Sequence, residues 1–325
     1  MAKSWLFFRH EIANMSASSE SFEMGTQPIR QNRLHKLLHK NLRIPRSLTQ
    51  PFLLAVRIAG SPSQYWLRKR MAREIVKTSQ KLMNIPEKDG FRQFGPDDIE
   101  GIGQIVSYCT TVYEESRKAL SQEYLQKHPS KQFLLPILEG VEFCRHPELI
   151  RFMVSRTVLD SATAYLGTVP RLVGARLCWS PPNETARSSQ LFHFDFEDLQ
   201  QLKLFINIFE TTEEQGPLTF IPAEVSEHVQ KSIRRASRVS DERIYEAGAR
   251  NREVKLVGPP GSGAFLDTSR CLHYGSRFNK RDRLVLIIQF LNIHTSYQST
   301  APFQVPQNLP GLDLDSVQKL ALGIH

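Results

Sequence analysis

The feature that most constrains the fold of this 325-residue chain is a change of sequence pattern at Pro170. Beyond that proline, the apolar segments are short, β-rich and separated by turns that contain proline and glycine. The pattern predicts strands over residues 172–180, 190–197, 203–209, 218–222, 254–257, 264–266, 271–275 and 283–292. About eight short strands in one domain favour a double-sheet jelly roll, also called a double-stranded β-helix.

The chain before Pro170 has the wider apolar spacing of helices. Residues 64–83 place their apolar side chains on or near one stripe, and Asp97 or Asp98 can cap a second helix. A third helix is expected to begin near Pro147 and to end at Gly167. We therefore predict an α+β protein with a jelly-roll, cupin-like core, packed helices and a helical N-terminal extension.

These patterns divide the chain into four regions. A basic, poorly patterned extension covers residues 1–63, and a helical region that packs on the core covers residues 64–169. The jelly-roll core covers residues 170–295 and is followed by a tail over residues 296–325. A charged insert at residues 224–253 interrupts the strands and is a possible lid, although a solvated surface helix explains it equally well.

The net charge of +9 comes entirely from the start of the chain. Residues 1–90 contain 16 Lys/Arg and 6 Asp/Glu, whereas residues 91–325 contain 26 and 27. A basic N-terminus of this kind can contact an anionic partner such as nucleic acid, a membrane surface or an acidic protein. No nucleic-acid motif accompanies it, so a solvated basic arm is the simpler interpretation.

The sequence suggests a cytoplasmic protein. No apolar run approaches the roughly 20 residues that a membrane-spanning helix requires. The four cysteines are scattered and lack C-x-x-C spacing, which is typical of reduced thiols and not of a disulfide framework.

The candidate site begins with the predicted strand at residues 190–197. His193 and Asp195 are two positions apart, so they project from the same face of a strand. His273, in a later predicted strand, can supply a third ligand, and two histidines with one carboxylate form the facial triad of non-haem Fe(II) oxygenases. A single His-x-Asp is weak evidence, because such triplets arise by chance in many chains. An isolated histidine is also more often a hydrogen-bonded core residue.

Arg283 strengthens this hypothesis because it opens the apolar strand that follows His273. A buried guanidinium requires an anionic partner, and it can bind a carboxylate through two parallel hydrogen bonds. A dicarboxylate that chelates iron at one end would present that partner at its other end. A structural carboxylate is the alternative partner.

Further motifs resemble one protein family. The segment at residues 204–222 has an acidic turn that ends in Gly216-Pro217-Leu218 and continues into Phe220-Ile221-Pro222. Together with Lys88-Asp89-Gly90-Phe91 and the four residues of the candidate site, it resembles the phytanoyl-CoA dioxygenase-like oxygenases over roughly residues 88–295.

The resemblance implies an oxidoreductase with a jelly-roll core, Fe(II) as cofactor, and 2-oxoglutarate and O2 as co-substrates. His193, Asp195 and His273 would be the catalytic metal ligands, and Arg283 would bind the distal carboxylate of 2-oxoglutarate. Arg176 and Gln190 lie on strands expected to neighbour the pocket, where either one could contact co-substrate or substrate.

The implied dioxygenase reaction hydroxylates a small organic or acyl substrate, free or carrier-bound, and releases succinate and CO2. An aspartate at position 195 argues against halogenation, because related halogenases carry a small residue there. The alternative is a non-catalytic jelly-roll module, either a degenerate oxygenase or a cupin-like metal or ligand binder. The family resemblance does not identify the substrate.

Overall fold

The fold is taken from a computed structural model that covers most of the chain beyond its first fifty residues. It describes residues 55–56, 58–117, 133–195, 197–198, 200–233, 238–292, 303, 305 and 312–324. The predicted basic extension therefore lies almost wholly outside the described residues. None of the helices described is both long enough and apolar enough to cross a membrane.

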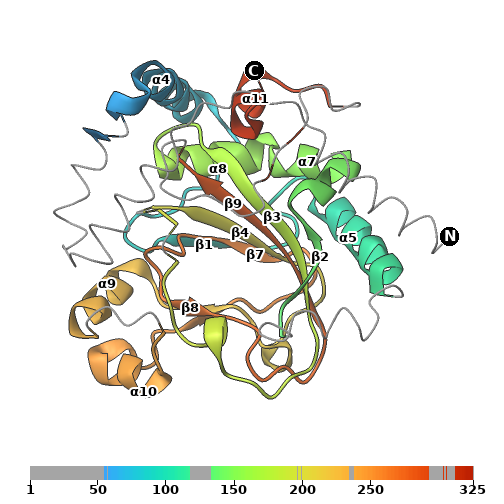
Figure 1. The fold of residues 1–325 in the computed structure, drawn as a ribbon, viewed down its shortest axis with the longest axis vertical. Coiled ribbons are helices and arrows are strands. Elements are labelled where there is room, and N and C mark those ends of the chain that lie inside the picture. The colour runs from blue at the N-terminus through green and yellow to red at the C-terminus, as the bar shows by residue number, and fades with distance from the viewer. Residues whose placement is uncertain are drawn as a thin grey trace, which may run out of the picture.

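Two antiparallel sheets form the centre of the molecule (Figure 1). The large sheet has six strands in the order β1-β7-β4-β9-β3-β2, and the small sheet has three in the order β6-β5-β8. The large sheet comprises β1 (Phe91–Phe94), β2 (Leu135–Glu139), β3 (Arg171–Ser180), β4 (Leu202–Asn207), β7 (Gly263–Leu266) and β9 (Arg283–Leu291). The small sheet comprises β5 (Thr219–Phe220), β6 (Val254–Lys255) and β8 (His273–Tyr274).

Helices cover one face of the large sheet, and the small sheet lies on its other side (Figure 1). The helices on the covered face are α4 (Pro62–Thr78), α5 (Ile102–Arg117), α7 (Pro147–Met153), α8 (Arg156–Leu166) and α11 (Ser316–Leu322). Because strand side chains alternate, Leu204 and Leu286 join the core beneath these helices. Phe205 and Val285 point the other way and pack in a separate cluster with Phe220 of the small sheet.

The insert predicted at residues 224–253 forms α9 (Ala223–Ser232), α10 (Asp241–Ile244) and a helical turn at Tyr245–Ala249. Val229 and Ile244 of this insert pack against Phe192 and Leu272, the apolar neighbours of His193 and His273. The described part of the insert therefore packs against the segments that carry the candidate ligands.

The α+β architecture with two facing antiparallel sheets confirms the predicted fold class, with three local differences. The predicted strand at residues 190–197 is a short 3-10 turn followed by isolated bridges at Phe192 and His193. The third predicted helix is divided into α7 and α8 by Val154 and Ser155. The region predicted as helical also contributes β1 and β2 to the large sheet.

Candidate metal centre

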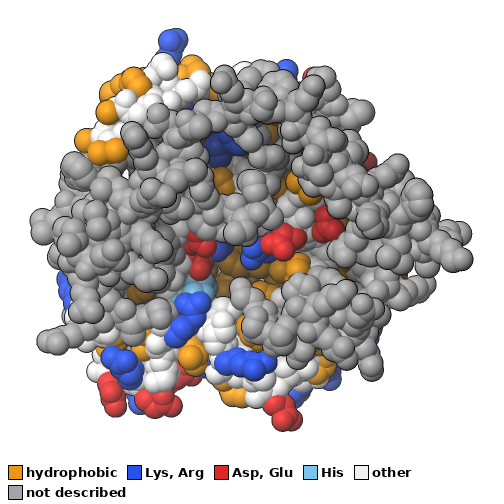
Figure 2. Space-filling model, viewed as in Figure 1, with side chains coloured by type: hydrophobic (Ala, Val, Ile, Leu, Met, Phe, Trp, Pro, Cys, Tyr) orange, Lys and Arg blue, Asp and Glu red, His pale blue; other side chains and the backbone are white. Residues whose placement is uncertain are grey.

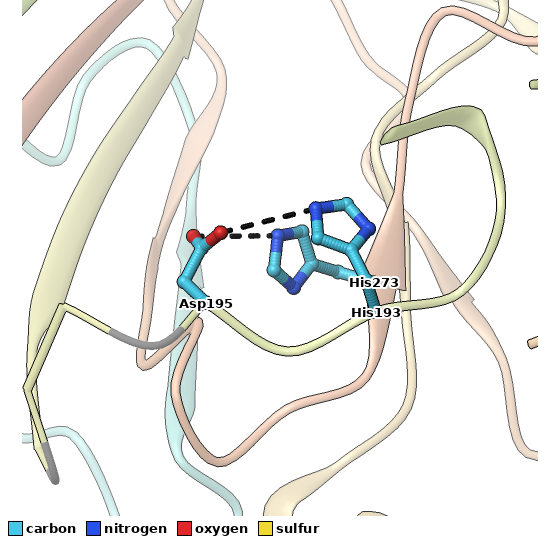
Figure 3. Close-up of side chains that lie close together, drawn as sticks. All are labelled: His193, Asp195 and His273. Atoms are coloured by element: carbon cyan, nitrogen blue, oxygen red, sulfur yellow. Dashed lines mark ion pairs between the residues drawn. The ribbon is translucent and has the colours of Figure 1, made fainter. Parts of the chain in front are cut away.

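His193, Asp195 and His273 converge at one point between the sheets (Figure 3). One possible ligand atom from each residue lies within 4.8 Å of the other two. The Nε2 atom of His193 is 3.8 Å from Oδ1 of Asp195, and that of His273 is 3.5 Å from Oδ2. The structure therefore brings together the three residues that the sequence analysis selected.

The backbone holds the two histidines side by side. His193 and His273 form an isolated antiparallel bridge, in which each backbone N–H donates to the other's carbonyl at 3.1 and 3.0 Å. The same segment is fixed two residues later, where the Asp195 N–H donates to the Thr268 carbonyl at 2.9 Å. Two hydrogen-bonded positions on one face thus orient the imidazoles toward the carboxylate.

Both imidazoles are in the form that a metal requires. Nδ1 of His193 is 2.9 Å from the Leu191 carbonyl, and Nδ1 of His273 is 3.0 Å from the Cys271 carbonyl. A carbonyl can only accept, so each Nδ1 carries the proton and each Nε2 keeps its lone pair free. Burial lowers the pKa of His193 to about 3 and also lowers the pKa of His273, which keeps both rings neutral.

Lys203 of β4 reaches the same point from the large sheet, and the sequence analysis did not select it. Its Nζ donates to Oδ2 of Asp195 at 2.6 Å, and both side chains are largely buried. Burial disfavours ionisation of Asp195, but the Lys203 ammonium outweighs this effect and holds the pKa of Asp195 well below its usual range. Burial also opposes the charge of Lys203, yet Asp195 outweighs it and raises the pKa of the ammonium.

Arg283 at the start of β9 is 3% exposed and carries no described counter-ion. Its Nη1 donates to the Gly216 carbonyl at 3.4 Å, and its Nε has no hydrogen-bond partner among the described residues. Burial lowers the pKa of Arg283 to about 10. A Cβ added at Gly275, two residues after His273, would lie 3.5 Å from Nη1, so this unpaired cation is near the strand that carries a candidate ligand.

Arg176 and Gln190 have partners within the protein. Nε of Arg176 is 2.6 Å from Oε1 of Glu139, in an ion pair on the face of the large sheet that also carries Arg283. The Gln190 side chain is fully buried, and its amide bonds to Asn183, Thr185 and two backbone groups. Contacts of Arg176 or Gln190 with co-substrate or substrate remain predictions.

The surface of the molecule is hollowed on the face shown in Figure 2. Hydrophobic side chains form the visible floor of the hollow, and acidic, basic and histidine side chains lie around it. A mixed apolar and charged surface of this kind suits a small organic ligand with a polar group.

Comparison with known proteins gives only a weak likeness to solved structures. No protein-family model matches the chain, and no curated protein does. EctD from S. alaskensis with 2-oxoglutarate and 5-hydroxyectoine is 16% identical, with a TM-score of 0.46 over 63% of this chain and 73% of EctD.

Two further structures are similar to the same degree. The non-heme alpha ketoglutarate dependent carbocyclase SnoK from nogalamycin biosynthesis is 14% identical, with a TM-score of 0.43 over 63% of this chain and 80% of SnoK. AviO1 from Streptomyces viridochromogenes Tue57 is 15% identical, with a TM-score of 0.44 over 64% of this chain and 92% of AviO1. No residue of this chain takes its role from similarity at this level.

Proposed function

We propose that this protein is an Fe(II)- and 2-oxoglutarate-dependent oxygenase of the phytanoyl-CoA dioxygenase-like type. One observation carries the proposal: His193, Asp195 and His273 converge, and the buried guanidinium of Arg283, which has no counter-ion among the described residues, lies near Gly275, two residues after His273. A metal-binding triad alone would suit many proteins. A triad together with a buried cation of this kind suits a co-substrate that binds metal at one end and carries a carboxylate at the other.

The three ligand residues fit Fe(II). Two neutral imidazole nitrogens and one carboxylate oxygen form the facial donor set that non-haem Fe(II) oxygenases use. Such a set leaves coordination positions open, and bound iron would use them to activate dioxygen with 2-oxoglutarate as the reductant. His193 and His273 would present Nε2 to the metal, while their Nδ1–H groups keep the rings oriented.

Arg283 fits the distal carboxylate of 2-oxoglutarate. Its burial excludes water from the guanidinium, so a carboxylate would be bound in a medium where charge-assisted hydrogen bonds are strong. Val285 and Ile287 follow Arg283 on the same face of β9 and provide apolar surface for the methylene groups of the co-substrate. The unsatisfied Nε would gain an acceptor.

The proposed reaction is the hydroxylation of a small organic or carrier-bound acyl substrate, with release of succinate and CO2. Asp195 occupies the third ligand position, which favours hydroxylation over halogenation. Glu139 and Arg176 lie on the same face of the large sheet as Arg283 and are candidates for contact with substrate.

Anaerobic absorption spectroscopy tests the proposal. Addition of Fe(II) and then 2-oxoglutarate to the metal-free protein should produce a charge-transfer band that requires both additions. The band should be absent in both His193→Ala and Arg283→Ala. Arg281→Ala is the matched control. The Arg281 side chain is exposed, and its Nε is 3.0 Å from Oε2 of Glu214, which is not one of the candidate ligands. A folded wild-type protein that shows no band would contradict the proposal.

A non-catalytic binding module is the second candidate, and the ion pair between Lys203 and Asp195 favours it. Asp195 is already paired with the ammonium of Lys203, as expected for a site that binds no metal or binds it weakly. This candidate predicts that 2-oxoglutarate either fails to bind or binds without being consumed. Succinate release during incubation with Fe(II), O2 and candidate substrates separates the two functions.

A further inference from the structure

Lys203 is an unusual neighbour for a metal site. It extends from β4 of the large sheet, opposite Leu266 on β7 and Gln289 on β9, and reaches a carboxylate on the other side of the interior. Its side chain is 15% exposed and that of Asp195 is 16% exposed. The ammonium therefore lies in a largely dry environment, where its charge is retained because Asp195 lies 2.6 Å away.

The two oxygens of Asp195 have different surroundings. Oδ2 accepts the hydrogen bond from Lys203, whereas Oδ1 has no described lysine or arginine partner and faces Nε2 of His193 at 3.8 Å. The negative charge of the carboxylate is thus balanced by Lys203, within the protein itself. The protein holds a positive charge beside the ligand set into which a dication would have to bind.

We propose that Lys203 is the internal counter-ion of this metal site: it stabilises the metal-free triad, leaves only Oδ1 of Asp195 free for metal and weakens the binding of divalent cations. The proposal rests on the proposed function, because it requires His193, Asp195 and His273 to be metal ligands. Lys203 acts here as a positioning residue and does not itself contact the metal.

Two opposing effects set the direction of the change in metal affinity. Loss of a hydrogen bond that orients a ligand typically weakens metal binding by about 10–100-fold. Repulsion between unit charges about 4 Å apart, at an effective dielectric constant near 20, changes an equilibrium by about a thousandfold. A dication carries twice that charge, so repulsion is the larger effect and removal of the ammonium should tighten binding.

The test is a titration of the full-length metal-free protein with Mn(II), an air-stable substitute for Fe(II), with free Mn(II) measured by electron paramagnetic resonance. Lys203→Met should bind Mn(II) about tenfold or more tightly than the wild type. The thermal midpoint of this variant without metal should be lower, because Asp195 then lacks its counter-ion.

Lys203→Arg, which retains the charge, should remain close to the wild type in Mn(II) affinity and thermal midpoint. Lys255→Met is the matched control, since Lys255 pairs with Glu213 at 2.9 Å near the surface.

The outcomes separate the two proposals. Equal or weaker Mn(II) binding by Lys203→Met, with wild-type binding that depends on His193, would overturn the role of Lys203 and leave the metal site intact. Wild-type binding that is unchanged in His193→Ala would overturn the proposed function as well. If Lys203→Met does not fold without metal, Lys203→Gln provides the same comparison, because it removes the charge and keeps a donor for Asp195.

Discussion

Arg283 carries the sharpest prediction at the scale of single residues. Among the described residues, its buried guanidinium makes one long hydrogen bond and its Nε has no partner, and a buried unsatisfied donor costs free energy. We expect Arg283→Met to increase the free energy of unfolding of the metal-free protein by about 1 kcal/mol or more, while 2-oxoglutarate binding is lost. Urea denaturation and calorimetric titration measure the two effects. A less stable variant would show that Arg283 has a structural partner.

Asp267 predicts a pH dependence of stability. It is buried at the start of the turn that leads to His273. Burial raises its pKa to about 6, although Ser269 and Tyr165 donate hydrogen bonds to it. The folded state therefore favours the protonated carboxyl. The contribution of Asp267 to the free energy of unfolding is therefore fully present below the unfolded-state pKa near 3.8. It is lost as the pH rises through the folded-state pKa of about 6.

The measurement is urea unfolding of the wild type and of Asp267→Asn between pH 4 and pH 7.5. The neutral amide does not titrate, so the wild type should lose on the order of 3 kcal/mol relative to the variant over that window. Other titrating groups are shared by the two proteins and cancel in the difference. A difference that stays constant with pH would show that Asp267 keeps an ordinary pKa.

The sequence selected His193, Asp195, His273 and Arg283 by their spacing, their residue types and the family resemblance, and the structure brings the first three together. Lys203 was missed, since a lysine two positions before Phe205 reads as a surface residue unless the inward face of β4 is known. That face depends on which side of the large sheet the helices cover. The alternation of Lys203, Phe205 and Asn207 was the available signal.

At the scale of elements, α10 is fixed to the candidate site by Arg277. Its Nη1 is 2.6 Å from Oδ2 of Asp241 in α10, its Nε donates to the Gln190 carbonyl at 2.7 Å, and its guanidinium lies 3.6 Å from the ring centroid of Tyr274. One side chain thus connects the insert, the turn before His193 and β8.

Removal of this connection should destabilise the protein and loosen the insert. We expect Arg277→Met to lower the free energy of unfolding by about 2 kcal/mol, which is less than is typical for a broken buried ion pair because Asp241 is partly exposed. Hydrogen exchange should accelerate in α9 and α10, measured by mass spectrometry. Arg281→Met, which removes an exposed ion pair, should change stability by less than about 1 kcal/mol. Unchanged exchange in Arg277→Met would show that apolar packing alone holds the insert.

The sequence indicated where the strands of the core lie better than it indicated which strands pair with one another. The strands after Pro170 follow recognisable turns, and seven of the eight predicted ones coincide with observed strands, whereas residues 190–197 form only isolated bridges. β1 and β2 were missed because they lie in a region with the apolar spacing of helices, and β2 contains Pro136. Both are defined by their pairing with β7 and β3, which is a long-range property.

At the scale of the whole molecule, the candidate site joins the two sheets. Lys203 and Arg283 belong to the large sheet, whereas His273 belongs to the small sheet and His193 bridges to it. The sequence predicted the two-sheet architecture from the pattern after Pro170. It could not predict which charged residues of one sheet face which ligands of the other, because this depends on how the two sheets pack.

This arrangement predicts that metal and 2-oxoglutarate stabilise the whole fold cooperatively. A ligand that binds only the native state, present at 100 times its dissociation constant, adds about 2.7 kcal/mol to the free energy of unfolding. This corresponds to a rise of several degrees in the thermal midpoint.

Mn(II) alone should raise the thermal midpoint by binding the triad. 2-Oxoglutarate alone should bind weakly, because its chelating end lacks a metal. Together they should raise the midpoint by more than the sum of the separate shifts, because the co-substrate would then link Arg283 on one sheet to the triad on the other. Differential scanning calorimetry measures the shifts, and Arg283→Met should retain the response to Mn(II) and lose the cooperative part. Strictly additive shifts in the wild type would indicate that the dicarboxylate does not connect the two sheets and would require a different partner for Arg283.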